Sequence, residues 1–206
     1  MLAPLVRLVT GVQDRWVGLD PVDAEGEPIQ RVYFANHSSH LDAPVIWAAL
    51  PPVVRGRTRP VAARDYWDAG FRRVLSERWL HVVLIDRART EGGPPPSAPM
   101  EQALRDGDSL ILFPEGTRNL EPDDGLLGFK AGLYHLARAF PQIPFVPVYL
   151  ANLNRILPKG GRVPVPVIAR VTFGAPVPLW PDDDKDRYLA RARAALQDLA
   201  LAEDPG

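Results

Sequence analysis

The chain of 206 residues contains no cysteine. Disulfide bonds, thiolate metal ligands and a cysteine nucleophile are therefore excluded, and the redox compartment is left undetermined. An excess of charge of one sign is also missing, because 24 basic residues nearly balance 25 acidic ones. The overall charge thus gives no reason to expect a nucleic-acid partner. Hydrophobic residues make up 46% of the chain, enough for a sizeable core, and the length suits one domain.

Long apolar runs are absent as well. A membrane-spanning helix needs about 20 continuous apolar residues, whereas the longest candidate, APVIWAALPPVV, is short and interrupted by prolines. The N-terminal stretch lacks the basic region and the small-residue cleavage site of a signal peptide. From these features we expect a cytoplasmic location.

Near the N-terminus, apolar side chains recur at helical spacing. They are Leu2, Leu5, Val6, Val9, Val12 and Trp16. This pattern predicts an amphipathic helix over residues 1–17, ahead of a single domain over residues 18–206. Such a helix can dock in a membrane interface, where tryptophan and arginine lie at the boundary, or it can cover the core of the domain. The pattern by itself favours the second interpretation.

Along the rest of the chain, strand-like segments alternate with segments of helical periodicity. Strands are expected at 30–36, 60–63, 81–86, 109–113 and 143–150, with a β-rich stretch at 163–177. Helices are expected from Asp42 onward and at 66–79, 100–107, 129–140 and 182–202. The alternation predicts an α/β domain with a central, mostly parallel sheet flanked by helices.

The segment NHSSHLD, residues 36–42, places ionisable side chains directly after a predicted strand. If a turn brings Asp42 to the ring of His37, the carboxylate fixes the tautomer and makes the other ring nitrogen a general base. His37, His40 and Asp42 could instead begin a metal site, but no further cluster completes a ligand set, so no metal is predicted. Asp42 could also cap the following helix. The spacing by itself leaves these interpretations open.

A second polar segment, FPEGTRN, follows the apolar strand expected at 109–113. Ligands of α/β sheets usually bind at the carboxyl ends of strands. In this segment Gly116 allows a tight turn, Thr117 offers a hydroxyl, and Arg118 offers a planar fork for phosphate or carboxylate. A surface ion pair between Glu115 and Arg118 is the alternative.

Two further cations lie at comparable positions. Arg87 follows the strand expected at 81–86, and Lys130 lies at the start of the helix expected at 129–140, where backbone N–H groups also favour anions. Together with Arg118 they predict a site for one anionic group.

Taken in order, NHSSHLD, LIDR, FPEGTRN, FKAG and VPVYL resemble the motifs of the H-x4-D glycerolipid acyltransferases, from about residue 32 to residue 148. The resemblance implies that His37 is the general base and Asp42 its orienting partner. It also implies that Lys130 supports binding of the acceptor's glycerol phosphate and that residues 146–148 line an apolar part of the site. The residues implied to bind that phosphate directly are Arg87, Glu115, Gly116, Thr117 and Arg118.

Two features depart from the pattern of this family. Position 119 is asparagine where serine is common, and the stretch before Arg87 lacks the usual aromatic residue. The second departure concerns part of the acceptor pocket.

The resemblance implies transfer of a fatty acyl group from a thioester to the free hydroxyl of 1-acyl-glycerol-3-phosphate, giving phosphatidic acid in phospholipid biosynthesis. No metal or bound cofactor is implied, since acyl-CoA or acyl carrier protein would arrive as the acyl donor. The partners would be a lysophospholipid and a membrane surface, with the enzyme peripheral on the inner face of the cell membrane. Glycerol 3-phosphate or another lysolipid as acceptor, a non-catalytic lipid-binding protein and a fatty-acid-releasing hydrolase are the alternatives.

Overall fold

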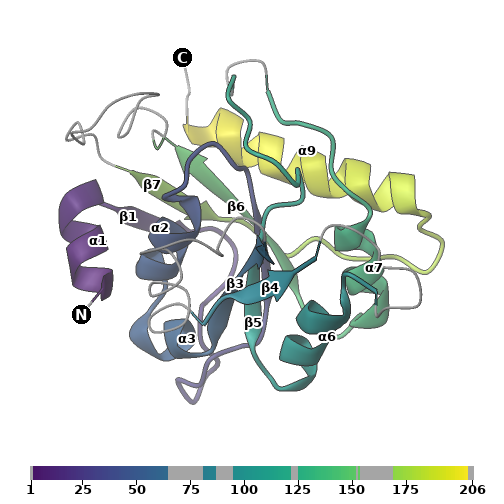
Figure 1. The fold of residues 1–206 in the computed structure, drawn as a ribbon, viewed down its shortest axis with the longest axis horizontal. Helices are drawn as coiled ribbons and strands as arrows, with labels where there is room; N and C mark the ends of the chain where they lie inside the picture. The colour runs from purple at the N-terminus through teal and green to yellow at the C-terminus, as the bar shows by residue number, and fades with distance from the viewer. Residues whose placement is uncertain are drawn as a thin grey trace.

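A computed structural model describes residues 2–64, 81–86, 95–121, 125–151, 153 and 169–203. Within these ranges a central sheet is covered by helices on both faces (Figure 1). The helix predicted at 66–79 and the cation Arg87 lie outside the described residues.

Seven described strands form one sheet in the order β1-β7-β6-β2-β5-β3-β4. The strands are β1 (Gln13–Trp16), β2 (Val32–Ala35), β3 (Thr58–Ala63), β4 (Val83–Ile85), β5 (Ser109–Leu112), β6 (Phe145–Ala151) and β7 (Arg170–Phe173). Strands β2 to β6 are parallel to one another, β7 is antiparallel to β6, and β1 is parallel to β7. The predicted α/β class with a mostly parallel sheet is confirmed.

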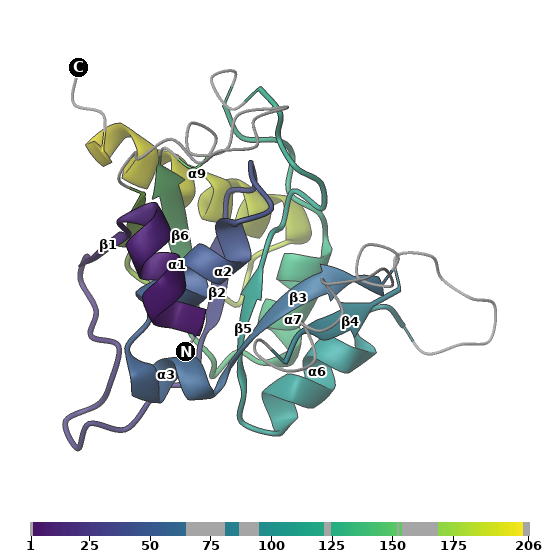
Figure 2. The same cartoon turned by 60° about the vertical axis from the view of Figure 1, so that its left-hand side comes forward.

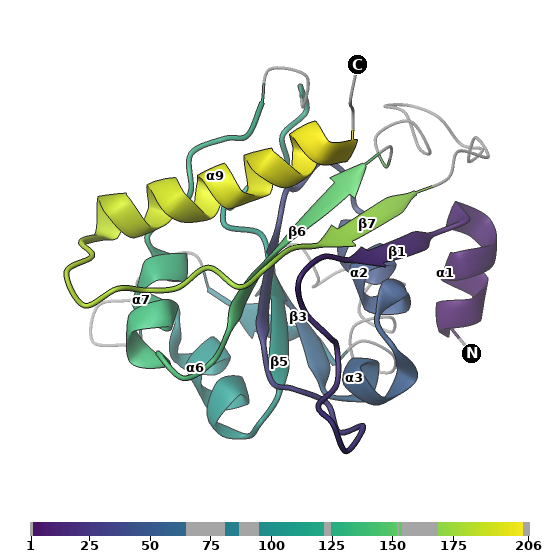
Figure 3. The same cartoon turned by 180° about the vertical axis from the view of Figure 1, so that it is seen from behind.

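The helices divide between the two faces of the sheet (Figures 2 and 3). On one face lie α1 (Leu2–Thr10), α2 (Asp42–Ala49) and α3 (Pro52–Gly56), and on the other α6 (Ala98–Arg105), α7 (Gly132–Ala139) and α9 (Lys185–Glu203). Strand β2 supplies both cores, because Tyr33 points toward α2 while Phe34 points toward α6 and α7. Covering on both faces explains why the central strands are continuous apolar runs.

The N-terminal segment differs from its prediction. The helix ends at Thr10, Gly11 adopts a positive φ of 56°, and Gln13–Trp16 forms β1. Trp16 stacks on Phe173 of β7 with ring centroids 3.9 Å apart, so pairing with a distant strand overrides the helical spacing. The prediction of one helix over residues 1–17 is therefore wrong beyond Thr10, and residues 13–16 belong to the sheet of the domain.

Helix α1 packs against α2, with Ala3 buried and Leu8 exposed at 82%. One side of α1 therefore covers the core of the domain, as one of the two interpretations expected, while Leu8 faces away from the core. None of the helices in the described ranges combines the length and the apolar character needed to cross a membrane.

The parallel alignment of β2 and β5 positions the two polar segments. Phe34 pairs with Leu112, so the residues that follow each strand emerge side by side at the same edge of the sheet. NHSSHLD follows β2 and FPEGTRN follows β5. The two segments therefore meet at the carboxyl edge, where α/β sheets bind ligands.

Candidate active site

The side chains of His37 and Asp42 contact each other directly. The Nδ1 atom of His37 lies 2.8 Å from Oδ2 of Asp42, and the same oxygen accepts the backbone N–H groups of Ser38 at 2.7 Å and Ser39 at 2.9 Å. Asp42 is fully buried and is the first residue of α2, with Leu41 at the N-cap position, so the capping interpretation of Asp42 is wrong. The carboxylate holds Nδ1 and leaves Nε2 of His37 for proton transfer.

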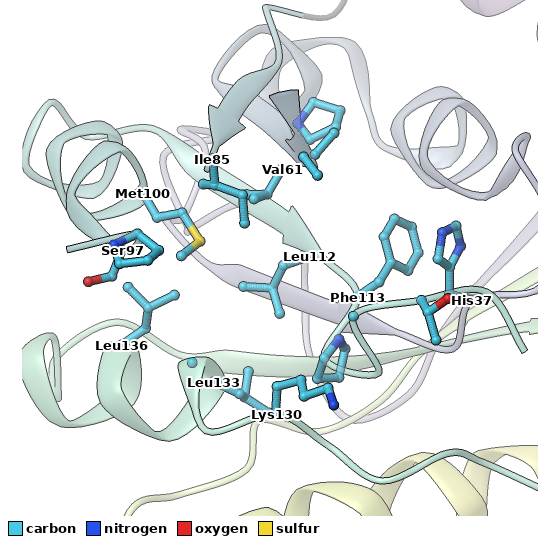
Figure 4. A pocket seen from close by; sticks show the side chains of 18 of the residues that line it. His37, Val61, Ile85, Ser97, Met100, Leu112, Phe113, Lys130, Leu133 and Leu136 are labelled. Atoms are coloured by element: carbon cyan, nitrogen blue, oxygen red, sulfur yellow. The ribbon is translucent and has the colours of Figure 1, made fainter. Parts of the chain in front are cut away.

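Phe113 fixes the plane of the His37 ring. The two rings stack with centroids 4.2 Å apart and an interplanar angle of 20°. Phe113 directly follows β5, so this contact is a consequence of the β2–β5 pairing. The His37 side chain remains 22% exposed and lines a cavity of about 970 Å³ (Figure 4).

Glu115 holds the main chain around the histidine. Its Oε1 accepts the backbone N–H of His37 at 3.0 Å, and its Oε2 accepts the backbone N–H of Leu127 at 3.0 Å. The residue is only 1% exposed, and this burial raises the pKa of its carboxyl, although the two hydrogen bonds act in the opposite direction. In this arrangement the Glu115 carboxylate faces the protein backbone, whereas the family resemblance implied that it binds the acceptor.

Asn36 anchors the loop that carries His37 to β6, the strand on the other side of β2. Its Nδ2 donates to the carbonyl of Leu150 at 3.0 Å, and its Oδ1 accepts the N–H of Leu150 at 2.8 Å. This amide pair continues the β2–β6 ladder beyond the end of β2. Neither Asn36 nor Phe113 was predicted from the sequence to support the site. Each is the first residue of one of the two polar motifs, but its partner is distant in sequence.

The groups predicted to bind an anion gather beside His37. Gly116, Thr117, Arg118 and Lys130 all line the same cavity as the histidine. Gly116 has a positive φ of 71°, and a Cβ there would lie 3.3 Å from Cγ of Lys130, so the lysine stem packs over the turn. Neither Arg118 nor Lys130 forms an ion pair with a carboxylate within the described part of the chain.

The remainder of the cavity is an apolar arm. In Figure 4, His37 and Lys130 lie toward one end, and Met100 and Leu136 lie toward the other. Its apolar side chains are those of Val61, Ile85, Met100, Leu112, Leu133 and Leu136, while Ser97 lies near Met100 at the far end. A polar, cationic end with a proton-accepting histidine thus continues into a space suited to a long apolar group.

Residues 146–148 do not line this cavity. Val146 and Val148 are fully buried in β6 and belong to the core under α2. The prediction that they line an apolar part of the site is therefore wrong. The reason is that β6 and β5 lie on opposite sides of β2, and the cavity is on the β5 side.

Within the described ranges, no group of three or more His, Asp or Glu residues is arranged to hold a metal ion. The contacts of Asp42 with His37 and two backbone N–H groups instead suit an orienting carboxylate. The chemistry that the site supports is removal of a proton from a substrate whose anionic group is held a short distance away.

Three comparisons with known proteins bear on this site. Residues 22–151 match the family model described as Acyltransferase. The chain is 32% identical over 185 residues to the 1-acyl-sn-glycerol-3-phosphate acyltransferase of Limnanthes alba, covering 84% of this chain and 61% of that protein. It is 30% identical over 130 residues to the protein of the same name from Haemophilus influenzae, covering 60% of this chain and 51% of that protein.

A solved structure shares the fold. The 1-acyl-sn-glycerophosphate acyltransferase PlsC of Thermotoga maritima matches with a TM-score of 0.72 at 19% identity, over 98% of this chain and 78% of that chain. This likeness concerns the architecture. The chain spans less than two thirds of the length of the curated relatives named above.

Replacing Glu115 by glutamine is expected to change how stability depends on pH. Because the pKa of Glu115 is raised, the folded protein binds this proton more tightly than the unfolded chain, and the wild-type free energy of unfolding falls as pH rises through the raised pKa. Glu115→Gln lacks this group. The difference in unfolding free energy, variant minus wild type, should therefore increase as pH rises above the usual value of 4.5.

Urea unfolding of both proteins at a series of pH values measures this difference. Glu25→Gln, which removes an exposed carboxylate, serves as the comparison for loss of surface charge. A difference for Glu115→Gln that is constant with pH, or that decreases as pH rises, would contradict the expectation.

Proposed function

Because this chain belongs to the acyltransferase family, whose model matches residues 22–151, we propose that it transfers a fatty acyl group from a thioester to the free hydroxyl of 1-acyl-glycerol-3-phosphate, giving phosphatidic acid. The observation that carries the proposal is the His37–Asp42 pair, which lies beside Arg118 and Lys130 at the polar end of a largely apolar cavity; neither cation has a carboxylate partner among the described residues. The names of the relatives support the choice of acceptor.

In the proposed reaction, Nε2 of His37 removes the proton of the acceptor hydroxyl. The oxygen attacks the carbonyl carbon of the thioester, and the tetrahedral intermediate expels the thiolate, which takes the proton from the imidazolium. The Asp42 carboxylate, 2.8 Å from Nδ1, stabilises the imidazolium while it exists. Direct transfer suits a chain that has no cysteine to form a thioester with the acyl group.

The acceptor is held by its phosphate. The hydroxyl of Thr117, the guanidinium of Arg118 and the ammonium of Lys130 all line the cavity and suit an anion with several acceptor oxygens. Holding the phosphate orients the hydroxyl toward His37, and such orientation supplies much of the rate in two-substrate reactions.

Acyl-CoA or acyl carrier protein is the proposed donor, and the proposed mechanism uses no metal or bound cofactor. Arg87 stays a predicted ligand of the acceptor.

The apolar arm is proposed to take the acyl chain of the donor. Its lining residues Val61, Leu112 and Leu136 offer no polar group to a ligand, so a hydrocarbon chain is the substrate part that fits. Met100 lies at the end away from His37, where it would meet the end of a long chain (Figure 4).

A membrane surface is the proposed source of the lysophospholipid, with the enzyme peripheral on the inner face of the cell membrane. Helix α1 is the proposed docking element, since Leu8 projects from it at 82% exposure beside the exposed Arg7. An aliphatic side chain next to an arginine suits the boundary between acyl chains and anionic headgroups.

The first test follows thiol release from acyl-CoA with a thiol-reactive dye, because a cysteine-free protein adds no background. Release should require lysophosphatidic acid, and His37→Ala should lower kcat by about 10²–10⁴-fold, the usual contribution of a general base. His81→Asn is the control. His81 is exposed, does not line the cavity, and has a positive φ of 46° that asparagine tolerates.

Further acceptors in the same assay separate the alternatives. Release with glycerol 3-phosphate or a zwitterionic lysolipid, but not with lysophosphatidic acid, would replace the proposed acceptor. Release without any acceptor would identify a hydrolase. Absence of release with both acyl-CoA and acyl carrier protein donors would leave a lipid-binding protein.

The acyl arm is tested by Met100→Trp, which adds volume at the end distant from His37. The ratio of kcat/KM for octanoyl-CoA over palmitoyl-CoA should rise by about tenfold or more, because apolar pockets discriminate chain length by such factors. Leu104→Met is the matched control, since Leu104 is buried on the same helix but does not line the cavity. An unchanged ratio in Met100→Trp would show that the donor chain binds elsewhere.

Membrane docking is tested by Leu8→Glu, because removal of the whole N-terminus would also delete β1 from the sheet. Sedimentation with anionic liposomes should retain several-fold less of the variant than of the wild type, while thermal stability is unchanged because the side chain is exposed. Leu201→Glu, on the exposed surface of α9, is the control. Equal losses in both variants would argue against α1 as the docking element.

A further inference from the structure

We propose that Asn119 is a positioning residue for the catalytic histidine. It acts through the main chain, and the proposal rests on the proposed function in which His37 is the general base. We call residues 115–119 the strap. Both ends of the strap are bonded to the main chain of His37.

The two attachments of the strap are hydrogen bonds to the main chain of His37. At one end, Oε1 of Glu115 accepts the N–H of His37 at 3.0 Å. At the other end, the N–H of Asn119 donates to the carbonyl of His37 at 2.6 Å. The main-chain donor and acceptor of the histidine are thus both used by the same five-residue segment.

The side chain of Asn119 holds its own backbone in place. Its Nδ2 donates to the carbonyl of Gly125 at 2.6 Å, and its Oδ1 accepts the N–H of Glu121 at 3.1 Å. Both halves of the amide are therefore used, and Asn119 is only 8% exposed. With the side chain fixed on two partners, the Asn119 N–H stays directed at His37.

Packing does not replace these hydrogen bonds. Glu115 and Asn119 also line a second cavity of about 420 Å³, which Gln197 and Leu201 of α9 line as well. The strap is therefore not closely packed against the helix there. A strap with open space beside it depends on its polar attachments to keep its position.

Most of the residues proposed to bind the anion lie between the two attachments, whereas Lys130 lies outside the strap. Gly116, Thr117 and Arg118 form the middle of the strap and line the cavity with the His37 ring. The distance between bound phosphate and imidazole is therefore set by the two main-chain bonds to His37. Loosening one attachment should misplace the general base relative to a phosphate that is still bound, and a displacement of about 1 Å can lower a rate by about 10²-fold.

The test is Asn119→Ala, assayed with lysophosphatidic acid and acyl-CoA. We expect kcat to fall by about 10–100-fold while KM for lysophosphatidic acid changes by less than about twofold. Gln30→Ala is the matched control. The Gln30 amide also makes two bonds to the main chain, in this case donating to the carbonyls of Leu104 at 2.7 Å and Asp108 at 2.9 Å, but at the opposite edge of the sheet. This control should lose comparable stability and keep the wild-type kcat per folded molecule.

A second readout needs no activity. Hydrogen exchange of the residue-119 amide reports its bond to His37 directly, and this amide should exchange faster in Asn119→Ala than in the wild type, relative to amides of β2. If the alanine variant does not fold, Asn119→Asp is used, since it keeps the acceptor for Glu121 and loses the donor to Gly125.

Three results would overturn the proposal. One is an amide at position 119 that remains as protected as in the wild type. Another is a loss of kcat no larger than in Gln30→Ala, and the third is a raised KM with unchanged kcat, which would make Asn119 part of acceptor binding. A wild-type enzyme inactive with every acceptor would refute the proposed function, and the exchange measurement would still decide whether Asn119 holds the loop.

Discussion

The parallel pairing of β2 with β5 is the constraint on which the site depends. Every residue of both strands is buried, so their register is held by packing on two faces. Because Phe34 lies opposite Leu112, the chain leaves both strands at the same level. His37 and Phe113 then stack, and the segment after β5 bonds to the main chain of His37.

The buried carboxylates of Asp42 and Glu115 hold this arrangement rigid, but their burial costs desolvation free energy. Asp42 and Glu115 lie close enough for the charge of Asp42 to add to the burial that raises the pKa of Glu115. Backbone N–H groups offset the cost, two donating to Asp42 and two to Glu115. The histidine is thereby oriented at its ring by Asp42 and at its main chain by Glu115 and Asn119. Such preorganisation is what a general base requires.

The cavity joins two chemical environments because it crosses from the carboxyl edge of the sheet to its α6–α7 face. At the edge, the strap and the start of α7 present Thr117, Arg118 and Lys130. Below the edge, Leu112 and the neighbouring strands β3 and β4 present apolar side chains. A substrate pair with a phosphate and a hydrocarbon chain matches this division, which is the physical basis for the proposed lipid chemistry.

By itself, the sequence determined the α/β class, the mostly parallel sheet and the location of both polar motifs after strands, because these follow from local periodicity and turn chemistry. The tertiary structure alone decided that residues 13–16 form a strand and that Glu115 faces the main chain of His37. It also decided that Asn36 and Phe113 support the site. The bonding partners concerned are 78 residues apart for Glu115 and 114 apart for Asn36, and contacts at such separations leave no pattern in a single sequence.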